Sequence, residues 1–266
     1  MIEAWKCVAF VMAFLSFGMA LYFWLKSKMI KNTSSIFFLS KEETQHVLDA
    51  DADHYYETFN KVDLKLRKSK NIKDYKKKIG NSGSDGTEEA KEKITKCIEN
   101  MHKKIETRRD EIVDGIPLGK LMDIQWRIGF VGDDAYENGL PHTRGDVIIL
   151  NNKNIQRINM EEMTTMLVHE KIHVYQKKHA SDFSKHLEKD FTKTKKKQSQ
   201  TRPANPDADE FEYKRKGDGK VLKGTYNKNP TSFRDITFTE NDHTLEHPSE
   251  MIAYKLESLL SSSVTT

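Results

Sequence analysis

Residues 166–173 read MLVHEKIH, an H-E-x-x-H motif within a stretch of helical periodicity. On an α-helix, residues four apart lie one above the other, so His169 and His173 aim two imidazoles at one point. This arrangement suits a tetrahedral zinc ion, and Glu170 is placed to take the proton of a metal-bound water. The motif therefore predicts one zinc ion held by His169 and His173, with Glu170 as the general base.

The sequence around the motif predicts a nearly buried helix. Asn159 and Glu162 form a capping-box pattern at its start. Two adjacent apolar ridges cover most of its surface and comprise Met160, Met163, Leu167 and Val174, with Val168, Ile172 and Tyr175 beside them. Both histidines fall on the narrow polar stripe that remains. A buried helix has little reason to collect them there; the alternative is a solvent-facing stripe whose histidines bind nothing.

Catalytic zinc generally has three protein ligands and one open position. His179 follows the motif without the glycine that turns the chain back in the longer H-E-x-x-H-x-x-G-x-x-H motif. Glu250 is the better third ligand, because Pro248 is typical of a first helical position and places Glu250 in the first turn of a second helix. Ala253 then permits close packing. The alternative ligands are Glu246, His243 and His247. The other interpretation is that Glu250 only favours the helix dipole.

Composition limits the class of protein. The chain has 266 residues, enough for one domain of ordinary size with additions. Of its formal net charge of +4, residues 1–31 supply most, with four lysines against one glutamate. The remainder is nearly neutral, which argues against a dedicated nucleic-acid-binding protein.

Residues 7–25 form a 19-residue run without a charge, CVAFVMAFLSFGMALYFWL. This length is sufficient for a transmembrane helix. Aromatic residues gather at its C-terminal end, and no small-residue cleavage site follows, so an uncleaved anchor is favoured over a signal peptide. Lysines 26, 28 and 31 place the bulk of the chain on the cytoplasmic side. The two cysteines, Cys7 and Cys97, form no disulfide framework, in agreement with a reducing compartment.

The rest of the chain divides by composition. A capping-box pattern at Ser40 and Glu43 predicts a helix to about Arg67, and a second helix is expected over about 87–113. These two form either a helical hairpin or solvated spacers. The predicted domains are an anchor with its basic flank at 1–31, a helical region at 32–114 and a catalytic domain at 115–266. A basic loop or insertion at about 181–229 is expected to be solvated or to touch acidic lipid head groups.

Strand signals precede the motif, at 121–131 and 146–150. A sheet edge beside such a helix can hold an extended peptide by main-chain pairing. His142 and Arg144 precede the second strand and are either cleft-lining groups or part of a surface turn. The developing oxyanion of a hydrolysis needs a donor. The candidates are Tyr254, His247, Tyr175 and Arg144.

His169 and His173 with Glu250 in a downstream helix resemble the gluzincin metallopeptidases, whose third zinc ligand is a glutamate in an E-x-x-A helix. Residues 169–176 (HEKIHVYQ), 140–144 (LPHTR) and 247–250 (HPSE) are also similar to zincin-like proteins of large DNA viruses. The resemblance covers about 115–257. It implies an α+β zincin-like domain with a small sheet and an active-site helix, preceded here by one transmembrane helix and the helical hairpin.

The combined hypothesis is a membrane-anchored zinc metallopeptidase that acts on a peptide or protein, in a virion or a host membrane. Its activity is expected to be lost in acid, because protonated imidazoles do not bind zinc. The alternatives are a non-catalytic zincin-like protein, a helical membrane-tethered interaction protein with an accidental motif, and a hydrolase of non-peptide amides. The sequence does not give the oligomeric state.

Overall fold

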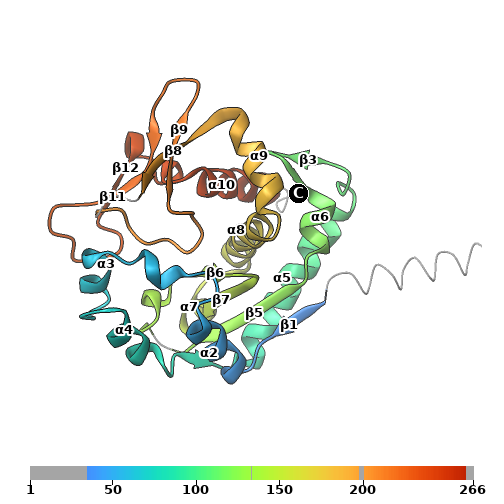
Figure 1. The fold of residues 1–266 in the computed structure, drawn as a ribbon. Coiled ribbons are helices and arrows are strands. Elements are labelled where there is room, and N and C mark those ends of the chain that lie inside the picture. The colour runs from blue at the N-terminus through green and yellow to red at the C-terminus, as the bar shows by residue number, and fades with distance from the viewer. Residues whose placement is uncertain (1–34, 133, 198–200, 262–266) are drawn as a thin grey trace, which may run out of the picture.

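The computed structural model describes residues 35–132, 134–197 and 201–261 (Figure 1). Its main sheet has the order β1-β5-β7-β6, with β2 also paired to β5. β1, β5 and β7 run parallel, and β6 is an antiparallel edge strand. The strands are β1 (Ile36–Phe38), β2 (Gly83–Ser84), β5 (Trp126–Val131), β6 (His142–Arg144) and β7 (Val147–Asn151). Every residue of β7 is buried, as expected for a central parallel strand covered on both faces.

Helix α8 (Met160–Lys178) carries the H-E-x-x-H motif and lies between this sheet and α10 (Pro248–Ser261) (Figure 1). Its predicted capping box is confirmed: Asn159 Oδ1 accepts from the main-chain N–H of Glu162 at 2.9 Å, and Glu162 accepts from the N–H of Asn159 at 2.8 Å. Pro248 is the first residue of α10, also as predicted. The motif therefore lies on a helix with partners on two sides.

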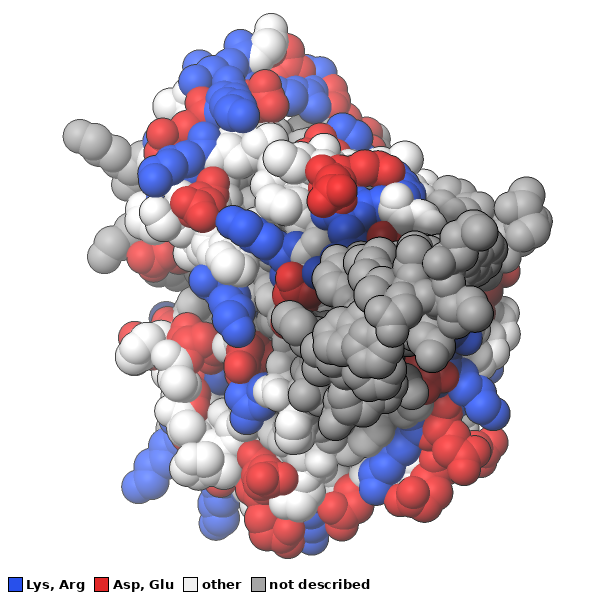
Figure 2. Space-filling view, turned by 90° about the vertical axis from the view of Figure 1, so that its right-hand side faces the viewer, with Lys and Arg blue, Asp and Glu red and all other residues white. Residues whose placement is uncertain are grey.

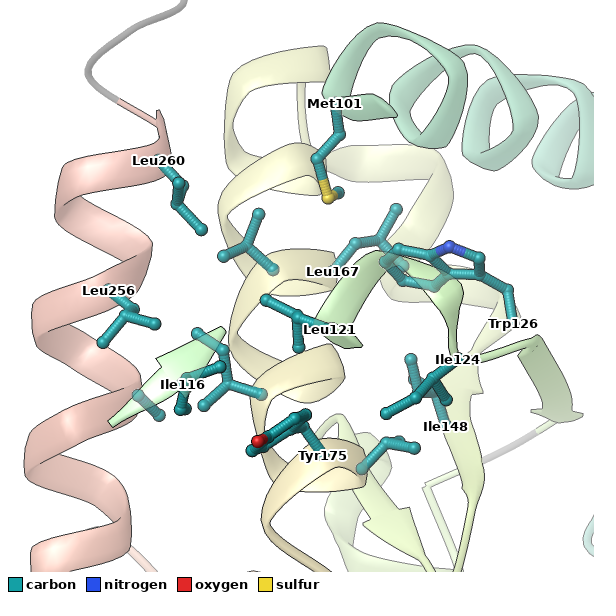
Figure 3. Packing of buried hydrophobic residues seen from close by; sticks show 14 of the residues in the cluster. Met101, Ile116, Leu121, Ile124, Trp126, Ile148, Leu167, Tyr175, Leu256 and Leu260 are labelled. Carbon is teal, nitrogen blue, oxygen red and sulfur yellow. The ribbon is translucent and has the colours of Figure 1, made fainter. Parts of the chain in front are cut away.

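The apolar core joins these layers. Figure 3 shows Leu256 and Leu260 of α10 pointing toward Leu167 of α8, with Trp126 and Ile148 of the sheet beyond. Fully burying one such aliphatic side chain contributes about 1.5–3 kcal/mol. Ala253, which is completely buried, lets α10 approach α8 closely. This packing fixes the two helices that carry the candidate ligands.

The helical region predicted over 32–114 is not a separate hairpin. Its first helix ends at Ala50, well before Arg67, because Asp51 takes a left-handed conformation with φ 47°. Both β1 and β2 from this region belong to the main sheet, and α5 packs on α8. Its helices are α2 (Lys41–Ala50), α3 (Lys61–Leu66), α4 (Ile72–Ile79) and α5 (Glu88–Glu106). The starts of α2 and α5 match the two predicted helices, but α3 was not predicted as a separate helix and α4 was not predicted at all. No feature of the sequence indicated that the region contributes strands to the sheet.

The predicted fold class is also wrong in its membrane component. Within the described parts of the chain, no helix combines the length and the apolar character that a bilayer span requires. The uncharged run at 7–25 lies outside the described residues. The architecture that the structure supports is α+β with small sheets. The predicted single-pass membrane localisation is therefore not supported.

The region predicted as a basic loop has regular structure. Helix α9 (Ala180–Asp190) leads into an antiparallel sheet of β8 (Phe191–Lys197), β9 (Phe211–Arg215) and β10 (Val221–Leu222). A further pair joins β11 (Gly224–Tyr226) to β12 (Ile236–Phe238). The remaining elements are the pair β3 (Ile112–Val113) and β4 (Ile116–Pro117), with helices α6 (Leu118–Asp123) and α7 (Asn152–Arg157). In Figure 1, β8 and β9 lie on the side of α10 away from the main sheet.

The surface shown in Figure 2 carries basic and acidic side chains side by side. No extended basic patch appears among the described residues visible on this face. The mixed charge of this surface contrasts with the acidic cavity described below.

Candidate metal centre

Helix α8 brings the two motif histidines together. His169 Nε2 and His173 Nε2 lie 3.0 Å apart, and the ring centroids are 4.7 Å apart. His173 is buried, and only 14% of the His169 side chain is exposed. The predicted i, i+4 geometry is therefore present, and the stripe that carries the histidines faces the interior.

Glu250, in the first turn of α10, completes a three-residue cluster. Its Oε2 lies 3.3 Å from His169 Nε2 and 3.5 Å from His173 Nε2. The three ligand atoms all lie within 4.8 Å of one another, and the Glu250 carboxylate is buried. The close approach of α10 to α8 at Ala253 brings this carboxylate to the histidines.

Hydrogen bonds on the far side of each ring set the tautomers. His169 Nδ1 donates to Glu257 Oε2 at 2.7 Å, since a carboxylate only accepts. His173 Nδ1 donates to Gln176 Oε1 at 2.9 Å, and the Gln176 amide is itself oriented by donating to the Ser249 carbonyl at 3.0 Å. When they are neutral, both imidazoles therefore present the Nε2 lone pair to the centre of the cluster. Metal-binding histidines are typically held by such a second hydrogen bond.

The donor set and spacing fit a zinc ion. For bonds of about 2.0–2.1 Å, tetrahedral geometry separates the ligand atoms by about 3.3–3.4 Å. The separations of 3.0, 3.3 and 3.5 Å bracket this value. Two lone pairs and one carboxylate oxygen at such distances need a cation among them, either a metal ion or a proton. Two imidazoles and a carboxylate also form a known set for catalytic zinc, which leaves one position open.

The pKa values of the cluster show the demand for positive charge. Burial lowers the pKa of His169, but hydrogen bonds to Glu250 and Glu257 raise it more, to about 11. Burial raises the pKa of Glu250, but His173 and His169 lower it further, to well below its usual range. The cluster therefore binds a proton tightly in the absence of a metal.

Glu170 lies beside the cluster with one oxygen unused. The residue is only 3% exposed, and Oε2 is a buried atom without a hydrogen-bond partner. Burial and the nearby charge of Asp207 raise the pKa of Glu170 to about 8. A buried acceptor without a partner costs free energy, so the site is incomplete without a further group.

Glu170, His169 and Glu250 all line one cavity of about 670 Å³. Its walls come from α8, α10, the segment before β6 and the loop that precedes β9. Eight carboxylates and one arginine line it: Glu137, Glu161, Glu162, Glu170, Asp207, Glu246, Glu250, Glu257 and Arg67. A cavity of this size accommodates part of a peptide or a small ligand.

The loop before β9 supplies residues that the sequence did not predict. Asn205 Nδ2 donates to Glu250 Oε1 at 2.8 Å and so holds the carboxylate oxygen that faces away from the histidines. Asp207 forms an ion pair with Lys177 of α8 at 2.9 Å. The turn-prone sequence around Pro203 and Pro206 indicated a loop, but nothing in it pointed to Glu250.

The other predicted site residues divide into two groups. Tyr254 lines the cavity, with its ring centroid 4.7 Å from that of His169. His142 also lines it, but its Nδ1 bonds the Leu140 carbonyl and its Nε2 bonds Tyr136 Oη. The predicted cleft therefore retains one tyrosine, whose hydroxyl can donate a hydrogen bond, and one histidine whose nitrogens are both used.

Arg144 and His247 do not line the cavity. Arg144 is buried in ion pairs with Asp51 at 2.6 Å and Asp53 at 2.7 Å. His247 Nδ1 accepts from the N–H of Ser249 at 3.1 Å and so caps α10. Their placement gives both a structural role instead of the predicted contact with substrate.

Four further candidates lie at different positions. Tyr175 is in the core, and His179 is the C-terminal cap of α8. His243 packs edge-on against Tyr254, while Glu246 lines the cavity. Of the described residues, only His169, His173 and Glu250 form a cluster with metal-ligand spacing.

Comparisons with known proteins do not assign a family. No family model, curated protein or solved structure matches this chain. The gluzincin resemblance therefore rests on the motif, and the functional argument rests on the geometry of the site.

Proposed function

We propose that this protein is a zinc-dependent hydrolase that cleaves peptide bonds, with Glu170 as general base. The observation that carries the proposal is the convergence of His169 Nε2, His173 Nε2 and Glu250 Oε2 at 3.0–3.5 Å. The orphan oxygen of Glu170 in the same cavity adds a base beside the cluster. A cluster that only stabilised the fold would have no need of this base.

A bound zinc supplies two effects, an acidified water and polarisation of the scissile carbonyl. Glu170 Oε2 accepts the proton of the attacking water and passes it to the leaving amine. Burial, followed by the charge of Asp207, raises the pKa of Glu170 above its ordinary value in the metal-free site. A carboxylate with a raised pKa is a stronger base and is suited to accept and return a proton. The bonds from Glu257 and Gln176 keep the imidazoles in the ligating tautomer throughout.

Tyr254 is the favoured donor to the oxyanion. It lines the cavity beside His169, and burial followed by the charge of Glu250 raises the pKa of its hydroxyl. The hydroxyl therefore keeps its proton and can donate to a developing negative charge. His142 is less suited, because its ring nitrogens are already used.

The experiment compares the full-length wild type with Glu170→Gln on a mixed peptide substrate. The variant keeps the size and the hydrogen-bonding capacity of the side chain but cannot act as a base. We expect the wild type to hydrolyse peptides and the variant to lose that activity while it retains zinc. Equal activity of the two proteins would overturn the assignment of Glu170, and a zinc-loaded wild type inert toward all peptides would favour a non-catalytic metal site.

A further inference from the structure

The cavity around the cluster has an excess of negative charge. Its lining includes eight Asp and Glu side chains, whereas Arg67 is its only Lys or Arg. Arg67 is already neutralised, because its Nη2 and Nε bond Glu137 and its Nη1 lies 3.4 Å from Asp63 Oδ1. Its guanidinium is also covered by two aromatic rings, at 4.1 and 4.7 Å from their centroids. Arg67 therefore does not offset the other carboxylates.

Three of these carboxylates have no basic ion-pair partner in the part of the chain that the structure describes. They are Glu161 and Glu162, at the start of α8, and Glu246, just before α10. Glu162 accepts a hydrogen bond from the main-chain N–H of Asn159. The positive charge of Arg202 lowers the pKa of Glu246 without forming an ion pair with it. Burial and the charge of Glu250 nevertheless raise the pKa of Glu246 to about 7. A bound divalent cation beside Glu250 leaves most of this negative charge uncompensated.

The positions of these carboxylates determine how far from the scissile bond a cationic group would bind. Glu246 lies near the cluster, because the charge of Glu250 raises its pKa. Glu161 precedes His169 by eight residues, or about 12 Å along a helix that rises about 1.5 Å per residue. An extended peptide advances about 3.3 Å per residue. A substrate bound at the cluster therefore reaches Glu161 with a residue about three or four positions from the scissile bond.

Main-chain pairing to β6 is restricted. The N–H of Thr143 donates to Asp207 at 3.2 Å, and its carbonyl accepts from Lys177 Nζ at 2.8 Å. The N–H of Gly145 donates to Asp53 at 3.2 Å. The predicted pairing of a peptide with this sheet edge is thus blocked at both residues. Substrate recognition therefore depends more on side-chain contacts in the cavity. Glu170, which lines this cavity, has a buried Oε2 without a hydrogen-bond partner.

Resting on the proposed hydrolase function, we infer that the cavity selects a substrate with an alkylammonium or guanidinium group within about four residues of the scissile bond. The group is either a lysine or arginine side chain or the free amine of a peptide chain. Glu161, Glu162 and Glu246 attract it, and Glu170 and the metal cluster act on the neighbouring bond.

Binding of fluorescent heptapeptides to full-length, zinc-loaded Glu170→Gln tests the inference without hydrolysis. The peptides carry lysine, norleucine or glutamate at one position and are N-terminally acetylated. A free-amine norleucine peptide separates the two sources of the cation. We expect about tenfold tighter binding of the lysine peptide than of the norleucine peptide at low salt, and less at high salt. If the glutamate peptide binds as tightly as the lysine peptide, or more tightly, the inference is overturned.

Variants locate the selectivity. Adding Glu161→Gln and Glu246→Gln to the same background should bring the lysine peptide close to the affinity of the norleucine peptide. Glu92→Gln changes an exposed glutamate of α5 outside the cavity and should leave the ratio unchanged. A ratio that survives the double change contradicts the assignment to these carboxylates. If wild type cleaves all the peptides at equal rates, the inference fails and the proposed hydrolase function stands. If the protein selects the lysine peptide but hydrolyses none, the proposed function fails and the inferred charge selectivity stands.

Discussion

Glu257 Oε2 and His169 Nδ1 are joined by a 2.7 Å hydrogen bond between α10 and α8. The bond holds the imidazole in the tautomer that directs Nε2 toward His173 and Glu250. Because Glu257 lies two turns after Glu250 on the same helix, α10 supplies both a ligand and the support for a ligand on α8.

Loss of the hydrogen bond between Glu257 and His169 should weaken zinc binding, although no zinc ligand is removed. We expect Glu257→Ala to lower zinc affinity about 10- to 100-fold, as is typical when the partner of a ligating histidine is removed. Competition with a chromogenic chelator measures the change, and Glu92→Ala serves as the control on an exposed surface. An unchanged affinity in Glu257→Ala would show that the bond does not position the ring.

Glu170→Gln should separate metal binding from catalysis. A positioned general base contributes about 10²- to 10⁴-fold to the rate, and the substitution removes only the base. We expect kcat/KM to fall by that factor at an unchanged zinc content. A fall below tenfold would assign the proton transfer to another group.

Zinc binding should release a proton. Burial lowers the pKa of His169, but Glu250 and Glu257 raise it more, to about 11, above the ordinary value of 6.5. The protonated ring therefore stabilises the metal-free fold fully below pH 6.5, and this stability is lost as pH rises through 11. Zinc needs the same lone pair, so we expect about one proton to be released per zinc at neutral pH and weaker zinc binding in acid.

Calorimetry in buffers of different ionisation enthalpy measures this release. The observed enthalpy of zinc binding should change linearly with the ionisation enthalpy of the buffer. A buffer-independent enthalpy at pH 7 is the contrary result, since it would mean that the cluster holds no displaceable proton.

Ionised Asp207 should increase the free energy of unfolding at neutral pH. Burial raises the pKa of this carboxyl, but Lys177 and then His173 lower it more, to about 2. A folded-state pKa below the ordinary value gives stability that is present above about pH 3.8 and is lost as pH falls through 2. In metal-free protein, Asp207→Asn should therefore cost about 2 kcal/mol at pH 7 and much less at pH 2.5. Urea unfolding at the two pH values measures both differences; an equal loss at both would contradict the charge-based explanation.

Ala253→Leu should disturb the cluster through packing alone. The alanine is fully buried at the close approach of α10 to α8, and overpacking a core typically costs about 1–3 kcal/mol. We expect a lower melting temperature and weaker zinc binding, because α10 carries Glu250. As a control, Lys255→Leu on the exposed face of the same helix should leave zinc affinity intact.

The convergence of His169, His173 and Glu250 was predictable because it depends on local rules. The i, i+4 spacing aligned His169 with His173, and Pro248 marked the helix start that places Glu250. Capping boxes at Ser40 and Asn159 gave the starts of α2 and α8 correctly. Each of these features depends on residues close together in the chain.

Features set by long-range contacts were not predictable. The contact of Asn205 with Glu250 joins residues 45 apart, and the turn-prone sequence between prolines carries no mark of it. Arg144 and His247 were reasonable cleft candidates by residue type, yet their carboxylate partners Asp51 and Asp209 are distant in sequence. The break after Ala50 depends on a single left-handed residue, Asp51, which interrupts an otherwise helical pattern.

Metal analysis of the purified full-length chain tests the central claim most directly. Wild type and the variants His173→Ala and Glu250→Ala are dialysed against the same zinc buffer, and bound zinc is determined by mass spectrometry. The structure predicts one zinc per wild-type chain and a strongly reduced content in both variants, because each removes one of three converging ligand atoms. A wild-type chain that remains metal-free, or variants that retain the full zinc content, would contradict the assignment of this cluster as a zinc site.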